Sequence, residues 1–209
     1  MIRVVVADDH TIVREGLKQL LSASVDFTVA GEACNGHEVI TRIRELEFDV
    51  LLLDISMPGR SGIELIRQIN SEKPALRILV LSMHEEEQYA VRAIRAGASG
   101  YLTKETAAAQ LLSALRKIAS GGVFITPAVA EQLALGAMPN TGGSPHSTLS
   151  NREFQVMGML VAGKSITEIA ANLNLSVKTV STHKARLMQK MGMASQTDLI
   201  RYALDNNLV

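Results

Sequence analysis

The chain begins with IRVVVAD (residues 2–8), an almost unbroken apolar run that ends in an aspartate. A stretch with an apolar helical face follows (Val13, Leu17, Leu20, Leu21), and after it comes FTVAGEA (27–33). Short β-branched runs that alternate with amphipathic stretches are typical of βαβ units. The first third of the chain therefore predicts a parallel sheet with crossover helices.

The alternation continues over three more strands and three more helices. The predicted strands are DVLLLD (49–54), RILVLS (77–82) and GYLTK (100–104). Most of the strands are continuous apolar runs, as expected when helices cover both faces of a parallel sheet. The pattern predicts an α/β fold with a doubly wound, five-stranded parallel sheet.

The pattern changes after residue 120. A short helix is expected at 127–135, and MPNTGGSPHS (138–147) reads as a flexible linker because it is rich in Gly, Pro and Ser. Beyond it only helices are expected, near 150–162, 165–173, 176–191 and 195–205. We therefore predict an α/β domain at 1–120, a linker at 121–148 and a small all-α domain at 149–209.

Composition agrees with two packed domains. The chain has 209 residues, of which 47% are hydrophobic and 20% charged, with zero formal net charge. Residues 149–209 carry seven basic and four acidic side chains, a net charge of +3 that leaves −3 on the rest. The C-terminal domain is therefore the better candidate for binding nucleic acid.

The sequence gives no sign of export or membrane insertion. No apolar run reaches the roughly 18 residues that span a bilayer, and the N-terminal stretch carries acids where a secretory peptide is apolar. A single cysteine, Cys34, has no second thiol for a disulfide or zinc site. We expect a cytoplasmic protein.

Polar side chains occupy the ends of four predicted strands. They are Asp8 and Asp9 after the first strand, Asp54 at the end of the third, Ser82 at the end of the fourth and Lys104 at the end of the fifth. Ligands of parallel sheets gather at this edge. Any one acid there could merely cap a helix or satisfy a loop, but five suitable side chains at one edge favour a site.

Three neighbouring carboxylates need a cation, and hard oxygen ligands suit Mg²⁺. Beside Mg²⁺ and the Lys104 ammonium, the Asp54 carboxylate could attack a phosphoryl group, to which Ser82 would donate a hydrogen bond. The sequence therefore predicts phosphoryl chemistry at Asp54.

The C-terminal domain contains a helix-turn-helix pattern. Ile166, Ile169, Ala170 and Leu173 form one apolar stripe, and Asn174-Leu175-Ser176 forms the turn. On the following helix, an apolar stripe is expected to face the core (Val177, Val180, Leu187, Met191). His183 lies on the same side, where a satisfied core histidine is the expected role.

Another face of that helix is free for DNA. Lys178, Ser181, Thr182 and Ala185 share it, with Lys184 and Arg186 placed for phosphate contacts. Basic side chains on a helix are more often simply solvated. The hypothesis of DNA binding therefore depends on the helix-turn-helix pattern and this polar helix face together. Thr179 completes the predicted DNA-binding set.

The first 120 residues resemble the receiver domains of two-component response regulators, a flavodoxin-like fold. The matching pieces are ADDH (7–10), LLLDISMPG (51–59), LVLSMH (79–84) and GYLTKE (100–105). The resemblance implies that Asp54 is the phosphoacceptor and that Asp9 and Asp54 bind Mg²⁺ directly. It further implies that Asp8 binds through water and Ser56 through its carbonyl, and that Ser82, Tyr101 and Lys104 form the switch. Pro58 and Gly59 fit the turn after the acceptor.

The C-terminal domain resembles the LuxR-type helix-turn-helix of NarL/FixJ regulators in SNRE (150–153), AGKSITEIAANL (162–173) and SVKTVSTHKARLMQKMG (176–192). The resemblance implies that the last helix mediates dimerisation (Leu199, Ile200, Ala203, Leu204). Ala185 departs from the longer residue common in relatives, which puts a base contact there in doubt.

Together these features predict a transcription regulator that a sensor histidine kinase phosphorylates on Asp54. Phosphorylation is expected to release the helix-turn-helix, which then dimerises on double-stranded DNA. Two other functions are possible. The first is a phosphatase or phosphotransferase, but such an enzyme normally has a second carboxylate two residues after the nucleophile, where this chain has Ser56. The second is a constitutive scaffold protein, which would not need the complete set of acidic-pocket residues that this chain has.

Overall fold

The computed structural model describes residues 1–57, 62–83, 87–135, 145–206 and 208. They fall into two compact units, Met1–Leu133 and Ala134–Val209, and each is treated by itself. The turn expected at Pro58 and Gly59 lies outside the described residues, as does most of the linker expected at 138–147.

The first unit contains a single five-stranded parallel sheet, as predicted. Its strands are β1 (Ile2–Ala7), β2 (Phe27–Ala33), β3 (Val50–Asp54), β4 (Arg77–Ser82) and β5 (Gly100–Thr103). They lie in the order β2-β1-β3-β4-β5. The order reverses between β1 and β3, and in such sheets a crevice opens at the carboxyl ends of the strands at that point.

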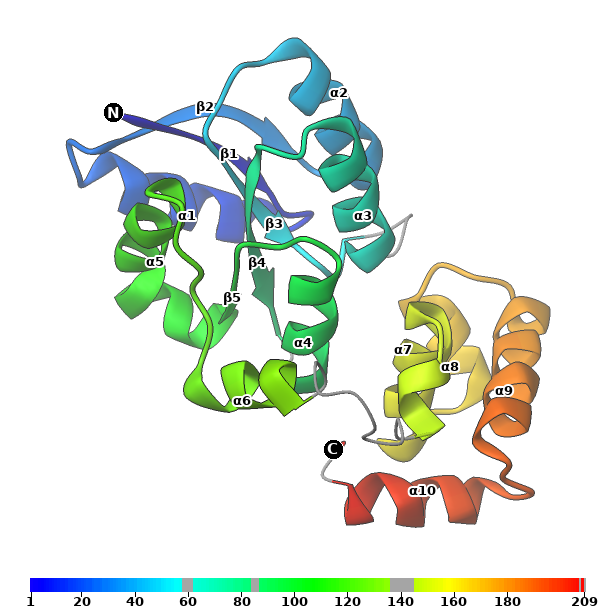
Figure 1. Cartoon of the computed structure of the whole chain (residues 1–209). Coiled ribbons are helices and arrows are strands. Elements are labelled where there is room, and N and C mark those ends of the chain that lie inside the picture. Colours follow the sequence, from blue (N-terminus) through cyan, green and yellow to red (C-terminus); the bar gives the residue numbers. More distant parts are fainter. Residues whose placement is uncertain (58–61, 84–86, 136–144, 207, 209) are drawn as a thin grey trace. The chain divides into compact units, whose positions relative to one another are not determined.

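Helices cover both faces of the sheet. They are α1 (Thr11–Ser22), α2 (Gly36–Glu45), α3 (Gly62–Glu72), α4 (Glu87–Arg95) and α5 (Lys104–Ala119). Figure 1 shows α1 and α5 on one face and α2, α3 and α4 on the other. Every residue of β3 is buried because both of its faces are covered. This explains why its sequence is an apolar run without alternation.

The fifth strand is shorter than predicted. It ends at Thr103, whose side chain accepts a hydrogen bond from the Thr106 amide and so caps α5. Lys104, expected as the last strand residue, is therefore the first residue of a helix. The cap overrides the strand pattern because it satisfies an amide that the first helical turn leaves unpaired.

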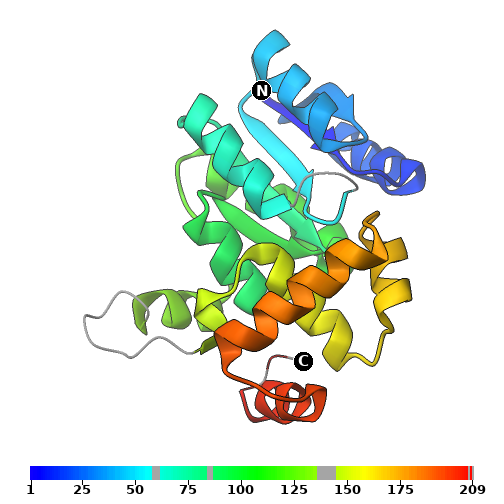
Figure 2. The same cartoon turned by 90° about the vertical axis from the view of Figure 1, so that its right-hand side faces the viewer.

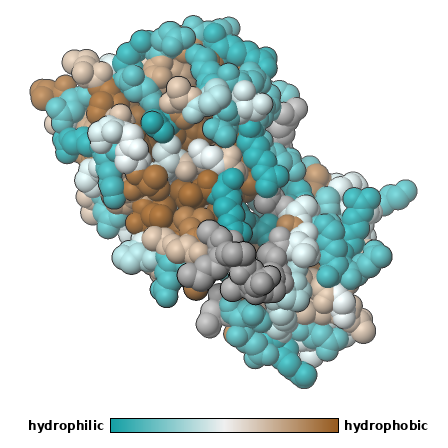
Figure 3. All heavy atoms as spheres, in the orientation of Figure 1, coloured by the Kyte–Doolittle hydropathy of each residue, from teal (hydrophilic) through white to brown (hydrophobic). Residues whose placement is uncertain are grey.

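The chain that follows α5 runs along the free edge of β5. The Tyr101 amide donates to the Phe124 carbonyl at 2.9 Å, and the Phe124 amide donates to the Ser99 carbonyl at 3.0 Å. The helix expected at 127–135 is present as α6 (Pro127–Leu135), with Thr126 Oγ1 accepting from the Val129 amide. The space-filling view shows apolar side chains gathered on part of the surface of this unit (Figure 3).

The second unit is helical, as predicted. It contains a short 3₁₀ helix η1 (Pro145–Thr148), then α7 (Asn151–Val161), α8 (Ile166–Asn172), α9 (Val177–Met191) and α10 (Gln196–Asp205). The four α-helices start after serine caps (Ser150, Ser165, Ser176, Ser195). In Figure 2, α9 is the long helix of the unit, drawn in orange.

Two details of this unit differ from the prediction. Residues 145–147, expected in the flexible linker, belong to η1, where buried His146 shares a hydrogen bond of 2.8 Å with Tyr202. Val177, expected in the core, is 48% exposed because it occupies the first position of α9. Val180, Leu187 and Met191 are buried, as expected.

Among the described residues, no helix combines the length and the apolar character that crossing a membrane requires.

Candidate functional site

The carboxyl ends of β1, β3 and β5 bring two carboxylates and a lysine together. Lys104 Nζ donates to Asp8 Oδ2 at 2.6 Å and to Asp54 Oδ2 at 2.8 Å. Both aspartate side chains are fully buried, and the lysine side chain is only 11% exposed. Three of the five polar residues that the sequence predicted at strand ends therefore meet at one place, called the acidic pocket below.

Burial and charge pull the pKa values of this pocket in opposite directions. Burial raises the pKa of Asp54, and hydrogen bonds from Lys104 and from the Ser56 amide offset only part of that rise. Burial lowers the pKa of Lys104, but its hydrogen bonds to Asp54 and Asp8 outweigh this and leave the pKa above its usual value. Lys104 therefore stays cationic between the two acids.

Asp9 and Ser56 complete the predicted set. The Asp9 side chain is 29% exposed, and its Oδ1 atom is buried without a hydrogen-bond donor. The Ser56 amide donates to Asp54 Oδ1 at 2.8 Å, which holds the loop after β3 beside the carboxylate. One ligand atom from each of Asp8, Asp9, His10 and Asp54 lies within 4.8 Å of the others.

The donor set fits a divalent cation. Carboxylate oxygens are the ligands that Mg²⁺ prefers, and a buried oxygen that accepts no hydrogen bond, such as Asp9 Oδ1, is costly unless a cation meets it. Three carboxylates beside one lysine also leave an excess of negative charge. The residues present therefore match the metal that the receiver resemblance implies.

Besides Lys104, the predicted switch contains Ser82 and Tyr101, which lie on the neighbouring strands β4 and β5. Ser82 is the last residue of β4 and is fully buried, and Tyr101 on β5 is 7% exposed. In the register between β4 and β5, Ser82 pairs with Thr103, the residue directly before Lys104. The serine hydroxyl thus belongs to the same edge of the sheet as the acidic pocket.

Two residues of this region were not singled out from the sequence. His10 places Nδ1 3.0 Å from Asp9 Oδ1 and 3.2 Å from Asp8 Oδ1. Arg14 on α1 donates from Nη1 to the Asp8 carbonyl at 2.7 Å and contacts Glu32 on β2. His10 could have been found from the sequence, because it is the last residue of the ADDH motif (7–10). The contact of Arg14 with the end of β1 depends on the fold and has no sequence signal.

In the helical unit, α8 and α9 form the predicted helix-turn-helix. Asn174 has φ +50°, a left-handed conformation that asparagine tolerates and that turns the chain between the helices. The Ser176 side chain then accepts from the Thr179 amide and caps α9. Buried Ile169 and Ala170 pack α8 into the core of the unit.

The predicted DNA-facing side of α9 points to solvent. Lys178, Ser181, Thr182, Ala185 and Arg186 are exposed, and Thr179 is half-buried. The hydroxyls of Ser181 and Thr182 donate to the carbonyls of Val177 and Lys178. Their lone pairs remain able to accept from a base edge or a water.

Lys184 has a structural contact that the sequence did not indicate. Its Nζ donates to Gln196 Oε1 at 2.8 Å, and Gln196 Nε2 donates to the Leu160 carbonyl at 3.3 Å. Lys184 therefore ties α9 to the start of α10 and to α7. Nδ1 of His183 is buried and has no hydrogen-bond partner among the described residues, so the expected satisfied core histidine is not found.

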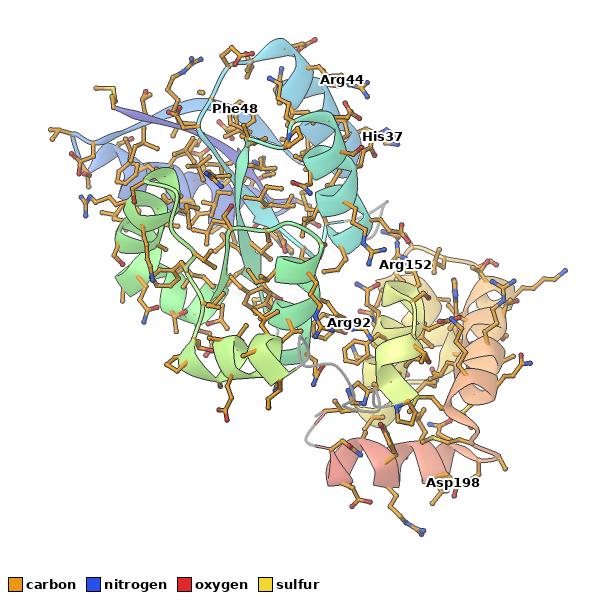
Figure 4. All side chains as sticks on the ribbon, in the orientation of Figure 1. His37, Arg44, Phe48, Arg92, Arg152 and Asp198 are labelled. Carbon is orange, nitrogen blue, oxygen red and sulfur yellow. The ribbon has the colours of Figure 1, made fainter. Side chains whose placement is uncertain are left out.

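The four residues predicted for dimerisation on α10 divide into two pairs. Leu199 and Ala203 are fully buried inside the helical unit, whereas Ile200 is half-buried and Leu204 is 62% exposed. Asp198 closes the N-terminal capping box of this helix, where Figure 4 labels it. Of the four predicted residues, only Ile200 and Leu204 therefore reach the outer surface of α10.

Two known families account for most of the chain. Residues 4–116 match the response regulator receiver domain, and residues 147–203 match the luxR family of bacterial regulatory proteins. The chain belongs to the response regulators of the NarL/FixJ type. It is accordingly a phosphorylation-dependent DNA-binding transcription regulator and not an enzyme.

Individual relatives cover the whole length. The response regulator GacA of Pseudomonas viridiflava is 36% identical over 100% of this chain and 98% of its own. The response regulator UvrY of Escherichia coli K12 is 36% identical over 100% of this chain and 96% of its own. A solved structure of RcsB from Salmonella enterica serovar Typhimurium, bound to the promoter P1flhDC in the presence of phosphomimetic BeF3⁻, is 31% identical with a TM-score of 0.63, covering 96% of this chain and 97% of that one.

Proposed function

We propose that Asp54 accepts a phosphoryl group from a sensor histidine kinase and that this modification controls DNA binding by α9. The contact of Lys104 with both Asp8 and Asp54 carries the proposal, because it holds a buried carboxylate beside a permanent cation. A regulator of this kind works where the chromosome is, so we place it in the cytoplasm.

Asp8, Asp9, Asp54 and the Ser56 carbonyl would hold Mg²⁺ in this pocket. When bound, Mg²⁺ supplies positive charge that neutralises the oxygens of the transferring phosphoryl group. The chain's own part is to keep these acids together against their mutual repulsion, which Lys104 does through its two hydrogen bonds.

A carboxylate oxygen of Asp54 forms the new bond to phosphorus, and the bond from phosphorus to the kinase histidine nitrogen breaks. The Lys104 ammonium donates to the phosphoryl oxygens, and the buried Ser82 hydroxyl turns toward them. Tyr101, on the strand next to Ser82, follows this movement. The result is a local change on β4 and β5 that biases the rest of the receiver.

The output is DNA binding by the exposed face of α9. Lys178, Ser181, Thr182 and Ala185 face the major groove there, Arg186 provides a phosphate contact, and Thr179 and Lys184 lie at the margin of this face. We narrow the self-association face of α10 to Ile200 and Leu204, since Leu199 and Ala203 pack inward. A dimer would read two half-sites about one helical turn apart. Phosphorylation releases the helical domain, proposed as residues 149–209, for this step.

The test is phosphorylation of the full chain by acetyl phosphate and Mg²⁺, followed by intact mass, oligomeric state and affinity for duplex DNA. The wild type gains one phosphoryl group, dimerises and binds DNA more tightly, whereas Asp54→Asn does none of these. Asp49→Asn is the matched control, because Asp49 is an exposed aspartate at the opposite end of the same strand region. A label retained by Asp54→Asn, or lost in Asp49→Asn, would refute the assignment.

A further inference from the structure

The acidic pocket contains a nitrogen donor. His10 directly follows Asp9 and precedes α1, and its Nδ1 lies 3.0 Å from Asp9 Oδ1 and 3.2 Å from Asp8 Oδ1. With Asp54 these residues form a cluster of four potential ligand side chains. The imidazole is thus part of the site and not merely near it.

The carboxylate oxygens of the cluster differ in the hydrogen bonds that they accept. Asp54 accepts from the Ser56 amide and from Lys104. Asp8 accepts from Lys104 and from the His10 amide, and its Oδ1 also shares a hydrogen bond of 3.2 Å with the His10 ring nitrogen Nδ1. Asp9 Oδ1 is buried and accepts no hydrogen bond, although His10 Nδ1 is 3.0 Å away. A buried oxygen beside a ring nitrogen, with no hydrogen bond joining them, suits two donors that face a common cation.

The separations agree with that arrangement. Two donors at right angles around an ion, each bonded at about 2.1 Å, lie about 3 Å apart. His10 Nδ1 has this spacing to Asp9 Oδ1 and nearly the same spacing to Asp8 Oδ1. Three carboxylates and one ammonium leave two negative charges, which one dication balances.

The ring of His10 contacts the cluster only through Nδ1, which shares a hydrogen bond with Asp8 Oδ1 and lies near Asp9 Oδ1. The His10 side chain is 66% exposed, and it makes no capping hydrogen bond to α1 although the residue occupies the cap position. The His10 backbone amide already holds Asp8 Oδ1 at 2.8 Å, so the position of the loop does not depend on the ring. Replacing the ring therefore still leaves Asp8 held by the His10 amide and by Lys104.

We propose that His10 supplies an imidazole nitrogen to the ion in this pocket, so that the site takes first-row transition dications such as Co²⁺ and Zn²⁺ besides Mg²⁺. Imidazole prefers these ions, whereas carboxylate and water suit Mg²⁺. The inference rests on the proposed metal pocket of Asp8, Asp9 and Asp54 and adds a specificity that those oxygens alone do not give. Availability of such an ion would then decide which metal accompanies the receiver.

The experiment measures Co²⁺ and Mg²⁺ binding to the full chain without a polyhistidine tag, by calorimetry at neutral pH. His10→Ala weakens Co²⁺ binding by at least about tenfold, since even the outer partners of metal ligands contribute that much. Its Mg²⁺ affinity falls by much less, because carboxylate and water oxygens are the ligands that Mg²⁺ prefers. His37→Ala is the matched control, because His37 is an exposed histidine on the outer side of α2 (Figure 4) and is not part of the cluster.

A second measurement reads the bond itself. Proton NMR of the Co²⁺ complex shows a strongly shifted ring N–H signal in the wild type and in His37→Ala, and this signal disappears in His10→Ala. If both ions bind but Co²⁺ affinity and the shifted signal are unchanged in His10→Ala, the inference is wrong while the metal pocket stands. A gain in both affinities would also overturn it, because the ring would then compete with the ion.

A separate experiment tests whether the metal pocket exists at all. Asp9→Asn and Asp54→Asn lose affinity for both ions if the proposed pocket is correct. Wild-type affinity in these two variants would remove the metal site, and the inference with it.

Discussion

Nζ of Lys104 lies 2.8 Å from Oδ2 of Asp54, although 50 positions separate the two residues in the chain. The contact joins the start of α5 to the end of β3, and both side chains are almost completely buried. Removing one partner of a buried ion pair leaves an uncompensated charge. The pair therefore supports the receiver structurally as well as serving its chemistry.

We expect Lys104→Met to lower the free energy of unfolding of the receiver by about 1–3 kcal/mol at neutral pH without divalent ions, less than for a fully enclosed pair because Lys104 retains some exposure. Added Mg²⁺ should restore part of this loss, because it replaces the missing positive charge. Hydrogen exchange of the β3 amides measures the effect in this unit alone. Lys73→Met is the control, since Lys73 pairs with the exposed Glu47. Equal protection of β3 in both variants would contradict the prediction.

The fold was largely predictable because its signals are local. The apolar run at 50–54 and the alternation around it reflect burial on both faces of β3, and the serine caps mark where α7–α10 begin. The acidic pocket followed from one topological rule about strand ends. Sequence patterns of this kind carry the order of elements but not the distances between side chains.

The parts that could not be predicted depend on packing between distant residues. Lys184 was expected on a DNA-facing surface, but its bond to Gln196 is set by the angle between α9 and α10. Leu199 and Ala203 follow the same helical periodicity as residues of a dimer face, yet they fill the core of their own unit. Periodicity shows which residues share a face and not what that face meets.

Gly100 provides a test of the contact between β5 and the chain after α5. A Cβ atom at this position would lie 2.9 Å from Leu79 Cδ1 and 3.0 Å from the Phe124 carbonyl oxygen. We expect Gly100→Ala to destabilise the receiver by about 1–3 kcal/mol, as overpacking does, and to loosen residues 123–125 from β5. Faster exchange of the Tyr101 amide, which donates to Phe124, measures this.

The control for Gly100→Ala is Gly16→Ala on α1. A Cβ at Gly16 meets nothing within 4 Å, and the residue lies inside an exposed part of the helix. Alanine there should stabilise the receiver by about 0.5–1 kcal/mol. If both alanines have the same effect, close packing at Gly100 is not what limits substitution.

Lys178 tests the DNA-facing side of α9. Because it is exposed and forms no ion pair among those described, its contribution to binding should be electrostatic. Lys178→Ala should weaken DNA binding and reduce the slope of log affinity against log salt by about one. Affinities of the phosphorylated full chain at several salt concentrations measure this slope. Lys73→Ala removes the same charge from the receiver and should leave the slope unchanged. A slope unchanged in Lys178→Ala would argue against a DNA-facing role for Lys178.

Lys184 should behave differently from Lys178 because of its bond to Gln196. Lys184→Ala is expected to increase hydrogen exchange at the start of α10 even without DNA, whereas Lys178→Ala is not. Any loss of DNA affinity in Lys184→Ala would then be partly structural. If exchange in α10 is the same in both variants, the contact does not support the helical unit.

Glu153 gives the helical unit a defined pH dependence. Its carboxylate accepts from Lys190 Nζ at 2.7 Å and from the Ser150 amide at 2.7 Å. Burial raises the pKa of Glu153, but these hydrogen bonds outweigh it and hold the pKa below its usual value. A lowered pKa in the folded state stabilises the fold above the ordinary glutamate pKa, and this stabilisation is lost as pH falls through the folded value.

Glu153→Gln keeps an amide side chain that can still accept from Ser150, so it removes mainly the charge. We expect a loss of about 1–2 kcal/mol in the stability of the helical unit at pH 7, measured by hydrogen exchange in α7 and α9. Hydrogen exchange under acid conditions should then show that the difference in stability between wild type and variant disappears below about pH 4.5. In that range glutamate becomes protonated first in the unfolded chain and then in the folded protein. Glu168→Gln, at the equivalent position of the exposed capping box of α8, should have a smaller effect because Glu168 has no lysine bonded to it. If this difference in stability stays constant from pH 7 to below about pH 4.5, the cap, and not the charge pair with Lys190, holds α7 to α9.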